Sequence, residues 1–219
     1  MTGAERIVDM HDLLLDAYGP QGWWPSRSSF ETVVGAVLTQ GTAWTNVEKA
    51  IRALRRAGAL SPEAMTELPH AHLTALIRPA GFFTRKADTL RSVLTKADSE
   101  FGGFDGLLSA PPSELRETLL SVRGVGPETA DAVLLYAAGH PAFPVDTYAR
   151  RVLGRHRIID ERAPYDDVAH LVVEALEGNE RMLNEFHALV VRVGKDFCRS
   201  RPRCGRCPGE GERRSTGLK

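Results

Sequence analysis

Apolar residues recur along this chain at intervals of three and four positions, which is the spacing of one face of an α-helix. The recurrence is clear in two early sets: Ile7, Met10, Leu14 and Tyr18, then Phe30, Val33, Val34, Val37 and Leu38. Alternation of apolar and polar residues, which would predict a strand, extends over no useful length. Pairs such as Gly19-Pro20 and Gly102-Gly103 interrupt the helical pattern. The sequence therefore predicts an all-α protein with about ten helices.

Composition sets the size and the charge of this protein. The chain has 219 residues, is 42% hydrophobic and carries a formal net charge of zero, so it can build a core but is not globally basic. Basic side chains nevertheless gather in residues 148–157 and 195–206, which favours local contacts with phosphate groups. No apolar run approaches the roughly 18 residues of a membrane span. The first helix contains acids and does not resemble a signal peptide.

The segment from Leu119 to Arg150 has the most specific pattern in the chain. Gly124 and Gly126 lie in a Val-Arg-Gly-Val-Gly turn and permit backbone angles that side chains resist. Pro127 suits the first position of the helix that follows. Such a turn directs backbone N–H groups outward, as in an anion-binding site. Asp146 opens a further helix, where an isolated aspartate would serve as an N-cap.

This segment contains the pattern Leu-x-x-Val-x-Gly-Val-Gly-x-x-Thr-Ala-Asp, and Val-Asp-Thr follows about twenty residues after the turn. The combination resembles the helix-hairpin-helix element of endonuclease III-like DNA glycosylases. The resemblance covers residues 5–207. It implies that residues 26–139 form a six-helix lobe ending in the hairpin. Residues 1–25 and 140–219 would then form a second helical lobe with a C-terminal cysteine loop. Double-stranded DNA with a damaged base would lie in the groove between the lobes. We therefore expect a monomer located in the cytoplasm, at the bacterial nucleoid.

The resemblance also assigns the chemistry. In this family the aspartate corresponding to Asp146 stabilises the positive charge that develops on the sugar, or activates water. Family members that also cut the DNA strand carry a lysine two residues after the second hairpin glycine, and this lysine forms a Schiff base. Here that position is Glu128, which cannot form an imine, although an acid in a first helical turn is also favoured by the helix dipole. We therefore predict a monofunctional glycosylase without AP lyase activity.

Two aromatic positions point to one branch of the family, the 3-methyladenine DNA glycosylases. These enzymes resemble this chain in a Trp-Trp-Pro segment, in an aromatic residue four after a Leu-Thr-Gln glutamine, and in the hairpin glutamate. We assign Trp24, Pro25, Trp44 and Glu128 to the base pocket, and expect Trp23 in the core. Flat faces receive a flipped base, and electron-rich rings favour a cationic alkylated purine, with 3-methyladenine first.

The remaining DNA contacts follow from the same resemblance. Gln40 corresponds to the wedge residue that fills the gap left by a flipped base, and Lys195 is expected to contact a phosphate. The hairpin residues assigned to DNA binding are Val122, Gly124, Val125, Gly126 and Thr129.

All three cysteines of the chain are Cys198, Cys204 and Cys207. This clustering argues against a secreted disulfide framework and for a metal site. The spacing resembles the family's iron–sulfur loop, in which four thiolates hold a [4Fe–4S] cluster, but the fourth position falls near Arg213. Three ligands with an external fourth, a degraded site, and a zinc site that uses a distant histidine such as His187 all remain open.

Two other functions fit the same sequence. The enzyme could be a glycosylase for an oxidised pyrimidine or a mismatched base, because a fold does not fix its substrate. A non-catalytic DNA-binding relative is the second alternative; the retained Asp146 argues against it.

Overall fold

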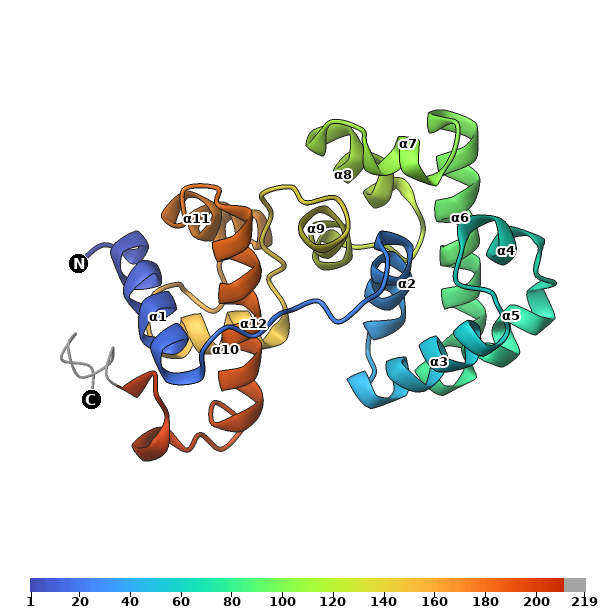
Figure 1. Cartoon of the computed structure of the whole chain (residues 1–219). Helices are drawn as coiled ribbons and strands as arrows, with labels where there is room; N and C mark the ends of the chain where they lie inside the picture. Colours follow the sequence, from blue (N-terminus) through green and yellow to red (C-terminus); the bar gives the residue numbers. More distant parts are fainter. Residues whose placement is uncertain (211–219) are drawn as a thin grey trace. The chain divides into compact units, whose positions relative to one another are not determined.

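The computed structural model describes residues 1–210, which form twelve α-helices, α1–α12, and two short 3-10 helices, η1 and η2. No strand occurs in this range, so the all-α prediction is confirmed. The chain divides into two compact units, one of residues Ser26–His140 and one of Met1–Pro25 with the chain from Pro141 onward (Figure 1). None of the helices in the described range combines the length and apolar character needed to cross a membrane.

The unit Ser26–His140 is built around one apolar helix, α2. Its elements are α2 (Ser29–Thr39), α3 (Trp44–Arg56), α4 (Pro62–Glu67), α5 (His70–Leu76), η1 (Arg78–Ala80), α6 (Phe83–Phe101), α7 (Phe104–Leu108), α8 (Pro112–Ser121) and α9 (Pro127–Tyr136). Helix α2 is buried along nearly its whole length and packs against α3, α6 and α9. It begins at Ser28, whose hydroxyl accepts the backbone N–H of Glu31 at 3.1 Å.

The turn between α8 and α9 is fixed against α6. Val122 and Val125 are buried, and the backbone N–H of Val125 donates to the carbonyl of Val122 at 3.0 Å. On α6, the Thr89 hydroxyl donates to the carbonyl of Arg123 at 3.1 Å. Gly124 has a φ of +96°, and a Cβ at this position would lie 2.4 Å from Thr89 Oγ1. Only glycine therefore fits at the centre of the hairpin.

The second unit is organised by α12. Its helices are α1 (Gly3–Tyr18), α10 (Thr147–Arg155), α11 (Tyr165–Ala175), α12 (Glu180–Asp196) and η2 (Cys204–Arg206). Helix α12 packs against α10 and α1, and α1 also packs against α11 (Figure 1). Phe143 and Phe186 are fully buried, with their ring centroids 5.8 Å apart. At Gly194, an added Cβ would meet Tyr148 Cδ1 at 2.6 Å, so the glycine allows α12 to approach α10 closely.

Replacing Gly124 by alanine is predicted to destabilise the protein, because the new methyl group meets Thr89 while the backbone stays at positive φ. A loss of about 1–3 kcal/mol is expected for such strain, or a fall in melting temperature of about 2–4 °C for each kcal/mol. Gly126→Ala is the matched control, since a Cβ at Gly126 meets nothing within 4 Å and its φ is −105°. Equal melting temperatures for the two variants would contradict the account of the hairpin.

Candidate active site

Asp146 occupies the N-cap of α10. Its Oδ1 accepts the backbone N–H of Ala149 at 2.7 Å, an arrangement that satisfies the helix start and places the carboxylate at the positive end of the helix dipole. The preceding residue, Val145, is buried and donates its N–H to the Tyr165 hydroxyl at 3.2 Å. The Asp146 side chain is 17% exposed. The carboxylate is therefore held in a fixed position that solvent can reach.

His187 of α12 lies beside this carboxylate. Its Nε2 is 3.9 Å from Asp146 Oδ2, and its side chain is only 8% exposed. The ring meets Phe143 edge-on, at 5.5 Å and 80°, and hydrogen-bonds the backbone carbonyl of Pro144. Burial lowers the pKa of His187, the neighbouring Asp146 raises it, and Lys195 lowers it. Burial is the largest of these effects, so the imidazole is neutral at neutral pH.

Lys195 lies over two aromatic rings near the C-terminal end of α12. Its Nζ is 5.9 Å from the Trp23 ring centroid and 5.8 Å from that of Tyr148, which is within the range of a cation–π interaction. Tyr148 was not among the residues expected from sequence, because its place in the site depends on the approach of α12 at Gly194. The packing of α12 therefore brings Lys195 and His187 into the neighbourhood of α10.

The Trp-Trp-Pro segment provides aromatic surface. Trp23 and Trp24 contact each other with ring centroids 5.3 Å apart and an interplanar angle of 63°. Both are partly buried and Pro25 is exposed. Trp23 was expected in the core, but its side chain is only partly buried, and the ammonium group of Lys195 lies over its ring.

In the unit Ser26–His140, Gln40 joins the hairpin. Gln40 is the C-cap of α2, and its amide Nε2 donates to the Gly124 carbonyl at 3.0 Å and to Thr129 Oγ1 at 2.8 Å. The structure thus brings three of the predicted DNA-binding residues together. The amide of Gln40 would have to leave the hairpin to act as the predicted wedge.

A pocket of about 230 Å³ borders this group and includes residues that the sequence did not single out. Phe82 is 65% exposed, with a φ of +45°, and the Arg85 guanidinium lies 5.8 Å from its ring centroid. An exposed aromatic ring beside a cation is a typical surface for stacking on nucleic-acid bases. Lys86, which also lines this pocket, is buried and donates to the carbonyls of Leu38 and Ala80, both at 2.8 Å.

Trp44 and Glu128 also lie in this unit. Trp44 is the first residue of α3 and is partly buried. Glu128 is exposed in the first turn of α9, where its charge is favourable to the helix dipole. Both side chains are thus accessible at helix starts.

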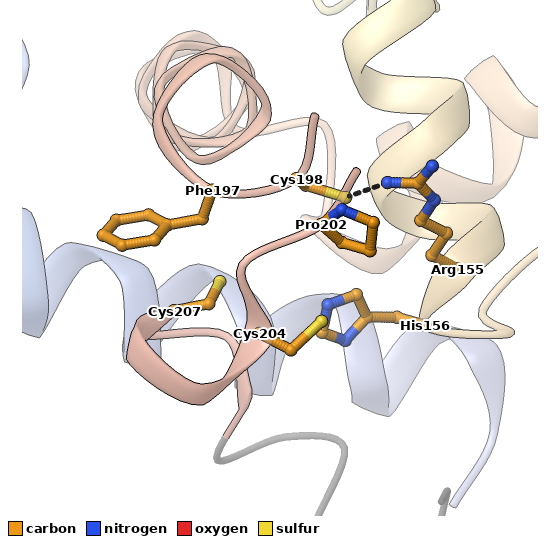
Figure 2. A pocket seen from close by; sticks show the side chains of 7 residues that line it. All are labelled: Arg155, His156, Phe197, Cys198, Pro202, Cys204 and Cys207. Atoms are coloured by element: carbon orange, nitrogen blue, oxygen red, sulfur yellow. Dashed lines mark hydrogen bonds between the residues drawn. The ribbon is translucent and has the colours of Figure 1, made fainter. Parts of the chain in front are cut away.

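The three cysteines line a single pocket of about 270 Å³ together with Arg155, His156, Phe197 and Pro202 (Figure 2). None of the three forms a disulfide. Cys198 is buried, and Arg155 Nη1 donates to its sulfur at 3.4 Å. Burial raises the pKa of Cys207, and the two other cysteines raise it further, because a thiolate here would be poorly solvated and close to others. The histidine at this pocket is His156; His187, considered as a zinc ligand, lies at Asp146 instead.

These residues do not fit a four-thiolate iron–sulfur cluster. The chain has three cysteines where the cluster takes four, and Arg213 lies outside the described residues. Within residues 1–210, no group of three or more His, Cys, Asp or Glu side chains is arranged to hold a metal ion.

Arginines from α10 tie the cysteine loop in place. Arg151 donates to the carbonyls of Cys198 at 2.6 Å and Gly194 at 3.1 Å, and Arg155 donates to the carbonyl of Arg199. Arg150 donates to the carbonyl of Ala163 at 2.7 Å. These guanidinium groups belong to the first basic run, which the sequence suggested for phosphate contacts, and here they bind backbone.

Comparison with known proteins identifies the family of this chain. The model described as HhH-GPD superfamily base excision DNA repair protein matches residues 34–177. A protein of Methanocaldococcus jannaschii named "Putative DNA repair glycosylase MJ1434" is 39% identical over 206 residues, covering 93% of this chain and 94% of its own. Endonuclease III of Haemophilus influenzae is 32% identical over 188 residues, with 83% and 81% covered.

Solved structures agree on the fold. A 3-methyladenine DNA glycosylase of H. pylori (MagIII), bound to 1,N6-ethenoadenine, has a TM-score of 0.76 and 26% identity, covering 89% of this chain and 98% of its own. An endonuclease III–DNA complex has a TM-score of 0.79 at 22% identity, covering 99% and 100%. The family resemblance read from the hairpin motif is confirmed. This chain belongs to the HhH-GPD superfamily of base excision DNA repair proteins.

Proposed function

We propose that this protein is a monofunctional DNA glycosylase that removes an alkylated purine, with 3-methyladenine as the preferred base. It acts as a monomer on double-stranded DNA at the nucleoid, in the cytoplasm. The observation that carries the proposal is Asp146, a carboxylate fixed at a helix start and reachable by solvent, in the segment matched by the family. Cleavage of an N-glycosidic bond leaves positive charge on the sugar, which a fixed carboxylate stabilises without further reorganisation.

The hairpin is the part of the protein that we propose to bind the DNA backbone. Its turn lies directly before α9, whose first N–H groups have no carbonyl partner within the helix. Such a helix start binds phosphate, and the positive φ of Gly124 shapes the turn. The exposed ring of Phe82 and the Arg85 side chain lie beside Gln40 and Gly124. We propose that this surface contacts DNA bases.

We propose that the protein does not cleave the DNA strand, because the hairpin position lacks the lysine that would form a Schiff base. The hairpin position that holds the nucleophilic lysine in bifunctional relatives is Glu128, a carboxylate. Lys86 is nearby in the same unit, but its ammonium group is buried and bound to two carbonyls, which leaves it poorly placed to attack a sugar. Lys195 is exposed near two aromatic rings and is assigned to a phosphate contact.

The substrate assignment rests on aromatic surface. Trp24 and Trp44 are partly exposed and can present faces to a base, and a cationic base gains more from such faces than a neutral one. The likeness to the H. pylori 3-methyladenine glycosylase supports the same class. The identity of 32% with an endonuclease III favours the second candidate, a glycosylase for another damaged base.

Asp146→Asn is expected to reduce base release by several orders of magnitude while leaving the melting temperature nearly unchanged. Asparagine still caps the helix, but it carries no charge to oppose that of the sugar. The measurement is single-turnover release of methylated bases from duplex DNA. Asp167→Asn, an exposed first-turn acid of α11, is the control. If Asp146→Asn releases methylated bases at the rate of the control, Asp146 takes no part in the reaction.

No covalent enzyme–DNA adduct is expected when the protein is treated with borohydride on abasic DNA, because no lysine stands at the hairpin. Electrophoresis of the reaction detects an adduct directly. An adduct formed by the wild type and lost in Lys195→Met, but kept in the surface control Lys96→Met, would show that Lys195 acts as the nucleophile and that the protein is a lyase.

Trp44→Ala is predicted to lower the release of 3-methyladenine by about ten- to a hundredfold, since stacking contributes about 1–3 kcal/mol for each base and 1.36 kcal/mol is tenfold in rate. Trp44→Phe keeps an aromatic face and should retain most of the rate. Release from methylated DNA is compared with release from thymine-glycol and mismatched duplexes. Activity on the thymine-glycol or mismatched duplexes alone would show that the protein is instead a glycosylase for another damaged base.

A further inference from the structure

The solvent-facing side of α3 carries a row of positive charges. The side of α3 that faces the core is defined by its buried residues, Val47, Ala50, Ile51 and Leu54. Lys49, Arg52 and Arg56 are exposed and follow each other at intervals of three and four residues, so they lie along one face of the helix. With 3.6 residues per turn, this face is opposite the buried one. We call these three side chains the α3 stripe.

The charges of the α3 stripe are not neutralised by neighbouring groups. Among residues 1–210, none of the three side chains has a hydrogen-bond or ion-pair partner, whereas Arg55 of the same helix donates to Glu31 at 2.7 Å. Glu48 is the only acid of α3. The neighbouring elements α5 and η1 pack against α3, contain no acid and add the exposed Arg78. This surface thus has excess positive charge in a chain of zero formal net charge.

Such a row of cations is unfavourable to the protein alone. Like charges four residues apart on a helix repel each other, as Arg52 and Arg56 do here. The basic run of α10 is different, because Arg151 and Arg155 donate to backbone carbonyls of the cysteine loop. The α3 stripe therefore has charge available for an anionic partner, and the α10 arginines have committed theirs within the fold.

The α3 stripe continues a surface that we propose to contact DNA. Gln40 and Gly41 line the pocket beside Phe82 and Arg85, and α3 begins three residues later, at Trp44 (Figure 1). At a rise of about 1.5 Å per residue, the stripe lies about 8–18 Å along α3 from its start. A DNA strand has one phosphate for about each 3.4 Å of helix axis, so this distance corresponds to about two to five base pairs.

We propose that the α3 stripe binds the phosphate backbone of double-stranded DNA about two to five base pairs away from the damaged base, on one side of it. From Lys49 to Arg56 the stripe is about 10 Å long, a length over which one strand carries about three phosphates. Three cations thus meet three anions. The contact holds the duplex without reading its sequence. The position relative to a damaged base rests on the proposed glycosylase function.

The test removes the three charges together. The stripe variant combines Lys49→Gln, Arg52→Gln and Arg56→Gln, because glutamine keeps a long polar side chain and a similar helix propensity. The control variant removes the same charge at surface positions elsewhere, by Lys96→Gln, Arg162→Gln and Arg181→Gln. Affinity for a duplex that contains an abasic-site analogue is measured over a series of salt concentrations. The plot of log affinity against log salt should be less steep by about 2.7 in the stripe variant, at about 0.9 per phosphate. The control should keep the wild-type slope.

Two further measurements locate the contact. Shortening the duplex from about ten to about two base pairs on one side of the analogue should lower the slope of the wild type by the same amount and leave that of the stripe variant unchanged. Shortening the other side should have no such differential effect. Glu48→Gln removes the acid beside the stripe and should tighten binding. Equal slopes for the wild type and the stripe variant would overturn the proposal. So would a control variant that lowers the slope as much, because the effect would then be one of total charge.

Binding and base release are measured separately, so failure of this proposal differs from failure of the proposed function. Wild-type protein that binds DNA through the stripe but releases no damaged base would refute the glycosylase function and leave the stripe in place. Base release by the wild type, with equal salt slopes for the wild type and the stripe variant, would do the reverse. Should the stripe variant fail to fold, the single variants Arg52→Gln and Arg56→Gln decide, each with a slope lower by about 0.9.

Discussion

Everything that surrounds Asp146 depends on how closely α12 can approach α10. The approach is set at Gly194, where a single methyl group would collide with the Tyr148 ring. With the two helices in contact, His187 reaches the carboxylate from a buried position and Lys195 reaches the faces of Tyr148 and Trp23. Of these groups only the imidazole is buried; the carboxylate and the ammonium group keep contact with solvent. Close packing of the two helices thus positions the charges without burying them.

The hairpin uses a second close approach in the other unit. Thr89 supports the turn by donating to Arg123, and Gln40 spans the turn and α9 by donating to Gly124 and Thr129. The carbonyls of Arg123 and Gly124 are thereby occupied from within the protein. An anion would be bound by N–H groups of the turn other than that of Val125, which already donates to Val122. The geometry of the hairpin turn is thus determined by polar side chains from two neighbouring helices.

The sequence was sufficient for the fold and for the place of Asp146 at a helix start, because helical spacing and a motif with fixed offsets are local properties. It was not sufficient for the neighbours of Asp146. His187 lies forty-one residues away, and only the packing of α12 makes it a neighbour rather than a metal ligand. Trp23 was expected in the core on its hydrophobicity alone, and nothing in the sequence indicated that the ammonium group of Lys195 would lie over its partly buried ring. The sequence also did not predict that the α10 arginines bind backbone carbonyls, because a run of positive charge does not indicate which acceptors will lie near it in the fold.

Those arginines determine how the C-terminal loop is attached to its unit. A guanidinium group stays charged at any physiological pH, and it donates to the carbonyls of Gly194, Cys198 and Arg199. Because neither partner of these bonds titrates in that range, the attachment of the loop to α10 does not depend on the ionisation of the three thiols beside it.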